Sequence, residues 1–248
     1  MIKFFRKIRY KLMNENKTGS SAETSVKAGK YLKYAIGEII LVIAGILIAL
    51  SINNRNEVKK FNKQVMNQLI LLSKEIDYDI SEYNYIIEDE PHYINYLKKL
   101  SQGEYQDLDL NRFYKVVAAN SSGINFGDTY KTLKENGGLN TINNLELREE
   151  IQTYHNYNRE SYAGMNNYHT SFVINYIEPK VLELMEYDSN NQLVKENTIK
   201  IIKGKTLNNV INQQLKISQN ILGIVERNLE EAIELKALLD NYIEEHKD

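Results

Sequence analysis

The side chains best suited to bind a metal or to move protons in this sequence are its four histidines: His92, His155, His169 and His246. A di-metal site in a helical bundle places a glutamate three positions before a histidine, so that both side chains lie on one helix face. None of the four histidines has a glutamate there. Glu88 lies four positions before His92, but Pro91 falls between them, and an acidic segment of this kind is typical of a solvated turn. We therefore predict no metal site and no cofactor.

Other catalytic patterns are incomplete. Gly204, Lys205 and Thr206 resemble the end of a phosphate-binding loop, but the first glycine of that loop would fall on Ile199. The chain contains no cysteine, which excludes a thiolate nucleophile. No serine lies in the glycine-flanked elbow that a hydrolase triad uses. We predict no catalytic residue and a protein that is not an enzyme.

One enzymatic alternative stays open, namely a hydrolase that acts on envelope material through paired carboxylates. It would need carboxylates that converge in one cleft. The candidates are Asp77, Asp79 and Glu82, which would have to meet Glu149 or Glu150. Sequence spacing does not show whether these side chains converge.

The segment YHNYNRESYAGMNNYH, at residues 154–169, is the candidate for recognition of a partner. Aromatic rings and a guanidinium are residue types that dominate binding hot spots. The candidate partner-binding residues are Tyr154, Tyr157, Arg159, Tyr162 and Tyr168. The competing interpretation places these tyrosines in a helical core with their hydroxyl groups reaching the surface, because aromatic residues at helical spacing commonly face a core.

The element that would position the rest of the chain is an apolar segment, YAIGEIILVIAGILIALSINN, at residues 34–54. A membrane-spanning helix needs about 20 mainly apolar residues. Residues 39–50 also lack the polar stripe of a helix buried in a soluble core. We predict a transmembrane helix over 34–54 that anchors the protein in a lipid bilayer. The alternative is a cleaved secretion signal ending at Ala49-Leu50-Ser51, but 33 residues precede the segment, which is long for a signal.

Glu38 is the charged residue inside this segment, and two interpretations of it are open. It lies about six residues, or roughly 9 Å, from the middle of the helix at about 1.5 Å per residue, so a carboxylate there is tolerated near the interface. Alternatively, Glu38, Gly45 and Ala49 share one helix face, and the two small residues let a second helix approach closely. We hypothesise a helix–helix contact on this face, which would produce a homo-oligomer.

Charge on the two sides of the segment predicts the orientation. Residues 1–33 carry nine Lys or Arg and two Glu, whereas the chain from Ile39 onward carries 22 basic and 30 acidic residues. Basic flanks stay in the cytoplasm, so we predict a cytoplasmic N-terminus and a periplasmic C-terminal domain at a bacterial inner membrane. A basic tip on an acidic body also argues against nucleic-acid binding. Residues 1–13 read as a basic amphipathic segment, and residues 14–33 as a flexible cytoplasmic linker.

Residues 55–248 are predicted to form a helical bundle domain. Apolar residues from Val58 to Ile87 recur in steps of three, four and four, an 11-residue period that predicts one helix from the span to about Glu88. Pro91 is expected to open a second helix that ends at Gly103.

Further helices are expected after Asp109, from Asp128 to Gly137, and through the Tyr-rich segment with a bend at Gly164. Pro179 is expected to kink the continuation of that helix, and residues 207–246 form a long amphipathic helix. The stretch LVKENTIKIIKGK is the one strand-like segment, which is too little for a sheet. The predicted fold class is all-α.

The sequence resembles an uncharacterised family of bacterial single-pass membrane proteins, a domain of unknown function, in three stretches: MIKFFRKIR, KYLKYAIGEIILVIAGILIALSINN and TYKTLKENGGLNTINNLELREEIQTY. Two features depart from the family: Arg55 stands where Trp usually follows Asn54, and the linker from Thr18 to Gly29 is longer. The resemblance implies an inner-membrane anchor and a helical extracytoplasmic body, and it carries no established activity. The sequence thus predicts a non-enzymatic scaffold, sensor-like domain or docking module for an unknown envelope protein.

Overall fold

The computed structural model describes Tyr10 and residues 21–106, 108–109, 112–120 and 123–246, with the backbone alone for 21–34. The regular secondary structure of these residues is helical, apart from an isolated antiparallel bridge between Tyr187 and Leu193, and loops connect the helices. The predicted all-α fold is therefore confirmed. The chain divides into two compact units, Met1–Phe61 and Asn62–Asp248.

The first unit contains the beginning of α2, the helix from Ser21 to Gln102. Beyond Ala35 this helix is long and apolar enough to cross a membrane. Its apolar side chains are not covered by other described residues: those more than 45% exposed include Ile36, Ile39, Ile40, Leu41, Val42, Ile43, Ile46, Leu47, Ile48, Leu50 and Ile52. A core helix of a soluble protein would bury such a surface, so this segment is suited to apolar surroundings outside the protein.

The helix also includes residues 21–33, where a flexible linker is predicted from the sequence. That part of the linker prediction is wrong, because Ala22, Glu23 and Ala28 are strong helix formers and no proline interrupts them. The predicted amphipathic segment at 1–13 lies outside the described residues, apart from Tyr10, and so do residues 14–20.

Pro91 does not start a new helix but lies inside α2, which continues to Gln102. Proline cannot donate a hydrogen bond to the carbonyl of Ile87 and strains the turn before it. The turns after Pro91 nevertheless stay helical, because Leu97 and Leu100 are fully buried in the core at that end. Gly103 ends the helix with a φ of 81°, as predicted.

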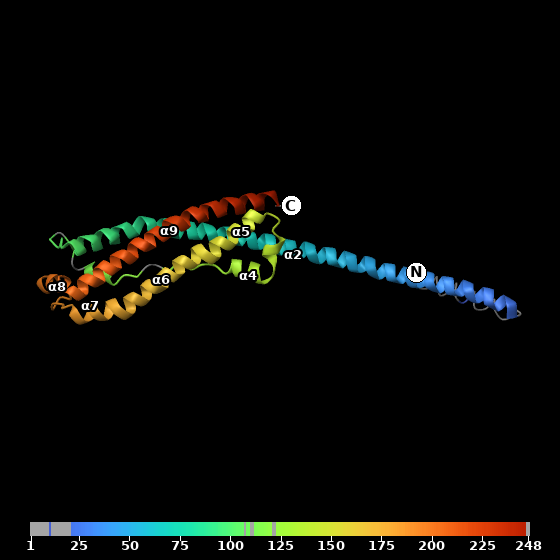
Figure 1. Cartoon of the computed structure of the whole chain (residues 1–248), viewed down its shortest axis with the longest axis horizontal. Helices are drawn as coiled ribbons and strands as arrows, with labels where there is room; N and C mark the ends of the chain where they lie inside the picture. Colours follow the sequence, from blue (N-terminus) through green and yellow to red (C-terminus); the bar gives the residue numbers. More distant parts are fainter. Residues whose placement is uncertain (1–9, 11–20, 107, 110–111, 121–122, 247–248) are drawn as a thin grey trace. The chain divides into compact units, whose positions relative to one another are not determined.

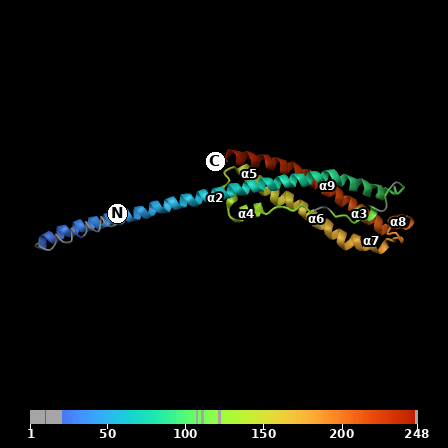
Figure 2. The same cartoon turned by 180° about the vertical axis from the view of Figure 1, so that it is seen from behind.

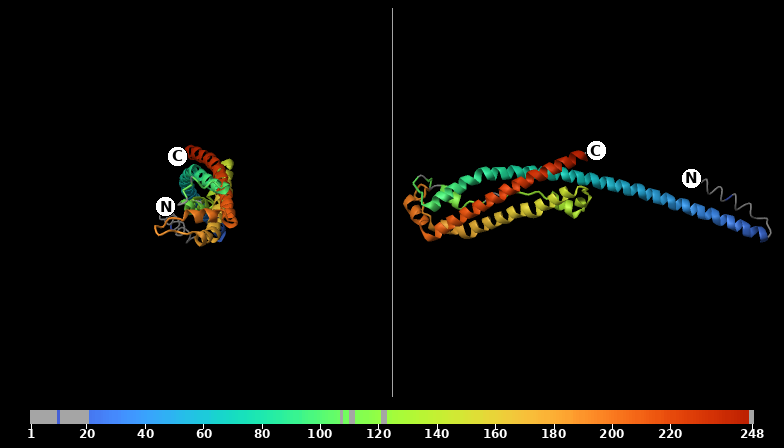
Figure 3. Two further views of the ribbon diagram at one scale, coloured as in Figure 1. Left: turned by 90° about the vertical axis from the view of Figure 1, so that its left-hand side faces the viewer. Right: turned by 45° about the horizontal axis from the view of Figure 1, so that its top comes forward.

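Three long helical columns build the second unit. The first is the part of α2 that follows Asn62. The second comprises α5 (Leu145–Thr153), the π-helical segment η3 (Tyr154–Arg159), α6 (Glu160–Phe172), the π-helical segment η4 (Val173–Ile177) and α7 (Glu178–Leu184). The third is α9 (Lys205–Glu245), which runs beside this part of α2 in the opposite direction (Figures 1 and 2). Figure 3 shows the same three columns side by side from other angles.

Shorter elements close the two ends of these columns. They are α3 (Phe113–Val117), α4 (Thr129–Glu135), the 3-10 turn η2 (Gly138–Thr141) and α8 (Lys195–Ile202). Helix α8 replaces the predicted strand-like stretch, because Thr198 and Ile202 face the core at helical spacing. Asp128 precedes α4 as predicted but makes no side-chain cap, and Asp109 does not cap α3, which begins after Arg112.

The buried stripe of α2 alternates steps of four and three residues, which corrects the predicted 11-residue period. Its buried members run from Val65 through Leu69, Leu72, Ile76, Asp79, Tyr83 and Ile86 to Leu97 and Leu100. Helix α9 shows the same alternation, with Leu207, Ile211, Gln214, Ser218, Ile221, Val225, Asn228, Ala232, Leu235 and Leu239 buried. This 3.5-residue period is the packing pattern of helices that lie nearly antiparallel along one another.

Candidate functional site

Polar side chains interrupt these stripes at two levels of the bundle core. We call the first polar layer the group formed by Asp79, Tyr83, Tyr154, Asn158, Arg159 and Asn228, and the second polar layer the group formed by Glu90, His169, Gln214 and Ser218. Asp79 and Glu90 are about three helical turns apart along α2. Each layer takes residues from all three columns, so each depends on the whole second unit being folded.

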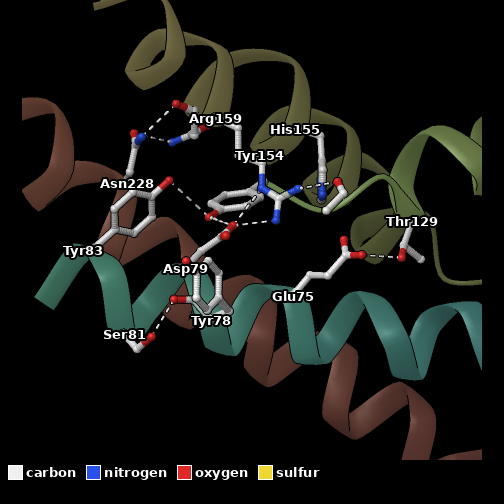
Figure 4. Close-up of polar contacts among 12 residues, drawn as sticks. Glu75, Tyr78, Asp79, Ser81, Tyr83, Thr129, Tyr154, His155, Arg159 and Asn228 are labelled. Carbon is white, nitrogen blue, oxygen red and sulfur yellow. Dashed lines mark hydrogen bonds and ion pairs between the residues drawn. The ribbon is translucent and has the colours of Figure 1, made fainter. Parts of the chain in front are cut away.

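The first polar layer is centred on an ion pair between Asp79 and Arg159, whose side chains are 0% and 5% exposed. Arg159 Nε and Nη2 each lie 2.7 Å from Asp79 Oδ2, and Tyr154 donates its hydroxyl to the same oxygen at 2.8 Å (Figure 4). Burial raises the pKa of Asp79, while the Arg159 charge and the Tyr154 hydroxyl act in the opposite direction. The second oxygen, Oδ1, has no hydrogen-bond partner among the described residues.

The π-helical turn η3 explains how one helix supplies so many of these groups. Tyr154, His155, Asn158 and Arg159 are all buried, although they form two adjacent pairs. In a regular α-helix, successive residues point about 100° apart, so these four side chains would spread over an arc of about 140°. The wider i→i+5 turn draws the two pairs closer together on the core face, and such turns are frequent at functional sites.

Asparagines and aromatic rings complete the first polar layer. Asn228 of α9 donates Nδ2 to the backbone carbonyl of Asn158 at 2.7 Å. The Arg159 guanidinium lies 4.7 Å from the centre of the Phe126 ring, and burial raises the pKa of Tyr83 to about 12, which keeps its hydroxyl protonated. The layer is closed and largely hydrogen-bonded. We therefore interpret it as a structural contact that fixes how α2, η3 and α9 align along one another.

His155 lies beside this layer as a neutral ring. Its Nδ1 donates to the carbonyl of Ile151 at 2.8 Å, and the ring stacks on Tyr130 with centroids 4.3 Å apart. Burial, together with the nearby Arg159 charge, lowers the pKa of His155 to about 3. The ring therefore carries no charge at neutral pH.

The extended chain that leads into α4 covers the first polar layer. Arg159 Nη1 donates to the carbonyl of Gly127 at 3.3 Å, and Thr129 donates its hydroxyl to the Glu75 carboxylate. A Cβ on Gly127 would lie 2.1 Å from the Glu75 carboxyl group, so glycine is needed for this close approach.

The second polar layer differs from the first because it surrounds a cavity of about 100 Å³. The cavity is lined by Glu90 of α2, by Tyr162 and His169 of α6, and by Gln214 and Ser218 of α9. Burial raises the pKa of Glu90, and a hydrogen bond from Ser218 partly offsets this effect. Burial also lowers the pKa of His169, against a smaller opposite effect of Gln214. The arrangement is suited to holding a small polar group.

The five predicted partner-binding residues do not form one surface. Tyr154, Arg159 and Tyr162 are buried at 1%, 4% and 1% exposure, so these three are not available for a partner at the surface. The alternative interpretation, that the tyrosines belong to the core, describes Tyr154 and Tyr162. Tyr157 and Tyr168 are exposed at 72% and 51%, and only these two keep the predicted surface role.

The residues of the predicted transmembrane contact, Glu38, Gly45 and Ala49, all lie on exposed parts of α2. A Cβ added to Gly45 would meet no atom within 4 Å, so space for a neighbouring helix exists there.

The carboxylates of the hydrolase alternative have different surroundings. Asp79 is buried against Arg159, whereas Asp77 is exposed and lies 3.3 Å from Lys236. Glu150 is surrounded by other acidic residues, among them Glu231 and Glu234. Burial is the main cause that raises the pKa of Glu150, and the neighbouring negative charges raise it further. Among the described residues no cluster of three or more His, Asp or Glu has the arrangement of a metal site.

Comparisons with protein-family models, with curated proteins and with solved structures return no match for this chain. The resemblance to a family of single-pass membrane proteins is therefore untested and stays a prediction.

Sequence reasoning missed Glu90, Gln214, Ser218 and Asn228. The signal that could have found them is the alternation of four- and three-residue steps, which places each of them where an apolar residue is expected. Read with an 11-residue period, the stripe passes through Ile80 and Ile87, and these residues are only half-buried.

Proposed function

We propose that this chain is a single-pass protein of a bacterial inner membrane that holds a helical domain, residues 62–248, in the periplasm as a non-enzymatic sensor-like or docking module. The observation that carries the proposal is the uncovered apolar surface of α2 between Ile36 and Ile52. Water would make such a surface costly, since apolar area contributes about 25 cal/mol per Å² when it leaves water. The excess of basic residues before Tyr34 supports the orientation.

The topology has a direct test. Alkaline phosphatase, which needs the periplasm to become active, is fused after Asp248 in one strain, and a cytoplasmic reporter is fused there in another. The proposal expects phosphatase activity, no activity of the cytoplasmic reporter, and a full-length chain in the membrane fraction after a carbonate wash. A mature chain trimmed after Ser51, or activity of the cytoplasmic reporter alone, would contradict it.

The docking role is tested at the two exposed tyrosines of the Tyr-rich segment. A photo-crosslinking residue at Tyr157 or Tyr168 is expected to trap one specific envelope protein in living cells, whereas the same residue at the exposed Tyr78 of α2 is not. Equal crosslinking at all three positions would indicate random collision and would contradict a docking surface.

Self-association is tested separately at the predicted transmembrane contact. Ala49→Leu adds bulk to the face shared by Glu38 and Gly45 and should weaken self-association in a membrane two-hybrid assay. Ala44→Leu, on another face of the same helix, serves as the control. Unchanged association in Ala49→Leu would remove the homo-oligomer from the proposal.

A further inference from the structure

The second polar layer has a feature that core packing does not explain. Glu90 occupies a position of the α2 stripe where the spacing calls for an apolar side chain, as Asp79 does 11 residues earlier. Asp79 faces the guanidinium of Arg159 at 2.7 Å. Glu90 instead faces a cavity of about 100 Å³, and among the described residues that line it there is no lysine and no arginine. The charge of Asp79 is thus compensated by an arginine of the protein, whereas Glu90 has no lysine or arginine among the described residues that line its cavity.

The cavity offers acceptors and negative charge. Asp89 lines it beside Glu90, so two carboxylates contribute to it. Gln214, which is 1% exposed, donates Nε2 to the carbonyl of Ala119 at 2.7 Å. Its buried carbonyl oxygen Oε1 makes no hydrogen bond of normal geometry among the described residues, although Gln214 faces His169 and raises the pKa of that ring against the larger effect of burial. An amide oxygen has two lone pairs, so it can accept a further hydrogen bond. A buried acceptor of this kind favours a ligand that brings an N–H or O–H group.

The walls and the size narrow the ligand class further. Tyr93 and Tyr162 are among the residues that line the cavity, and aromatic side chains attract cations through the faces of their rings. A volume of about 100 Å³ has room for several water molecules, so the cavity accepts a small head group. An anion would meet two carboxylates and is disfavoured.

We propose that this cavity binds a primary ammonium group, with Glu90 as its counter-charge, Gln214 as a second acceptor, and Tyr93 and Tyr162 as its aromatic walls. The ligand's ammonium would then compensate Glu90 as the guanidinium of Arg159 compensates Asp79. The inference is independent of the proposed membrane anchoring, because binding is measured on the purified protein.

The test is a titration of the full-length protein, in an uncharged maltoside detergent, with methylammonium chloride, followed through the methyl resonance of the ligand by NMR. Tetramethylammonium chloride is the cation without N–H donors, and sodium acetate is the anion of similar size. We expect saturable binding of methylammonium, and no saturable binding of tetramethylammonium or of acetate. Absence of saturable methylammonium binding, or equal binding of tetramethylammonium or acetate, would overturn the proposal.

Two variants assign the binding to this cavity. Glu90→Gln keeps the shape of the side chain and should weaken methylammonium binding by at least about tenfold, since hydrogen bonds to charged groups are the stronger ones. Ala119→Leu keeps every charge, fills the cavity and should abolish binding, so the two variants are independent routes to one answer. Glu88→Gln removes an exposed carboxylate two positions away and should bind like the unaltered protein. Unaltered binding in both Glu90→Gln and Ala119→Leu would refute the site.

Discussion

At the scale of single residues, the Asp79–Arg159 pair should be costly to break and far less costly to replace as a whole. Either charge alone would be left in the core without compensation, so Asp79→Asn and Arg159→Met are each expected to lower the free energy of unfolding by about 3–5 kcal/mol. The double variant Asp79→Leu/Arg159→Met removes both charges and should be more stable than either single variant. Urea unfolding of the full-length protein in detergent, followed by circular dichroism, measures all three.

The matched control for this prediction is an exposed ion pair on α7. Lys180 and Glu183 form a pair whose side chains are 49% and 63% exposed. Lys180→Met should change the free energy of unfolding by less than about 1 kcal/mol, because water screens exposed pairs. If the double variant in the core were as unstable as the sum of its two single variants, the pair would not act as one unit.

The buried His155 should make the stability of the protein depend on pH. Its pKa falls from 6.5 to about 3 on folding. Between these two pH values the unfolded chain therefore binds a proton at His155 that the folded protein does not bind. The stability that the neutral ring contributes is present in full above pH 6.5 and is lost as the pH falls toward 3, by at most about 1.4 kcal/mol per pH unit.

The variant His155→Phe keeps a ring against Tyr130 but does not titrate. Unfolding free energies measured between pH 4 and 7 should therefore fall less steeply for His155→Phe than for the unaltered protein. His92→Phe, at an exposed position of α2, should follow the unaltered protein. Identical slopes for His155→Phe and the unaltered protein would show that His155 is accessible to protons when folded.

At the scale of elements, the sequence predicts which segments are helical better than it predicts how they join. The long helix over 207–246, the helix stop at Gly103 and the all-α class follow from periodicity and glycine positions. The π-helical turns η3 and η4 do not, because nothing local distinguishes their residues from α-helical ones. They form because tertiary contacts, such as Arg159 with Asp79, draw adjacent residues into the core.

The candidate site shows the same limit. A search for catalytic motifs selects exposed or paired residues such as Asp77, while the half-buried carboxylate of Glu90 belongs to no motif. Its role becomes visible only when α6 and α9 bring Tyr162 and Gln214 to the same level of the bundle. Contacts between distant segments of the chain, and not local spacing, define this site.

Substitutions at two glycines, Gly137 and Gly164, test the backbone conformation of these elements. A Cβ at Gly137 or at Gly164 would meet no atom within 4 Å, so packing does not decide the outcome at either position. Gly137 has a φ of 77°, and Gly137→Ala should destabilise the protein by about 1–2 kcal/mol. Gly164 lies inside the continuous helix α6, so Gly164→Ala should stabilise the protein by about 0.5–1 kcal/mol. Thermal unfolding compares the two variants, and destabilisation by Gly164→Ala would contradict this and favour the predicted bend.

At the scale of the whole molecule, one helix carries two surfaces with opposite needs. Within α2, residues 36–52 expose apolar side chains, whereas Asp79 lies in the core of the second unit and the half-buried Glu90 lines its cavity. Helix α2 contains both the segment that is apolar enough to cross a membrane and a helix of the folded domain, without an intervening loop. The two parts of α2 therefore differ in their surroundings. Lipid would cover the apolar surface of residues 36–52, whereas α6 and α9 cover the part of α2 in the second unit.

This division predicts that the anchor can be removed without harming the domain. Ile43→Lys combined with Ile46→Lys places two charges near the middle of the apolar segment, where each costs about 2.5–3.5 kcal/mol in a bilayer. The double variant should move from the carbonate-washed membrane pellet to the soluble fraction. In the folded domain neither residue has a role, so binding of methylammonium and the urea midpoint should stay unchanged.

The control variant carries the same chemical change on exposed apolar residues of the second unit, Leu71→Lys and Ile174→Lys. It should stay in the membrane pellet, because neither position lies in the segment proposed to cross the membrane. Retention of the Ile43→Lys/Ile46→Lys protein in the pellet would mean that another surface holds the chain at the membrane. Release together with loss of the domain's cooperative unfolding would instead mean that the apolar segment supports the fold, and either result contradicts an anchor that acts through lipid alone.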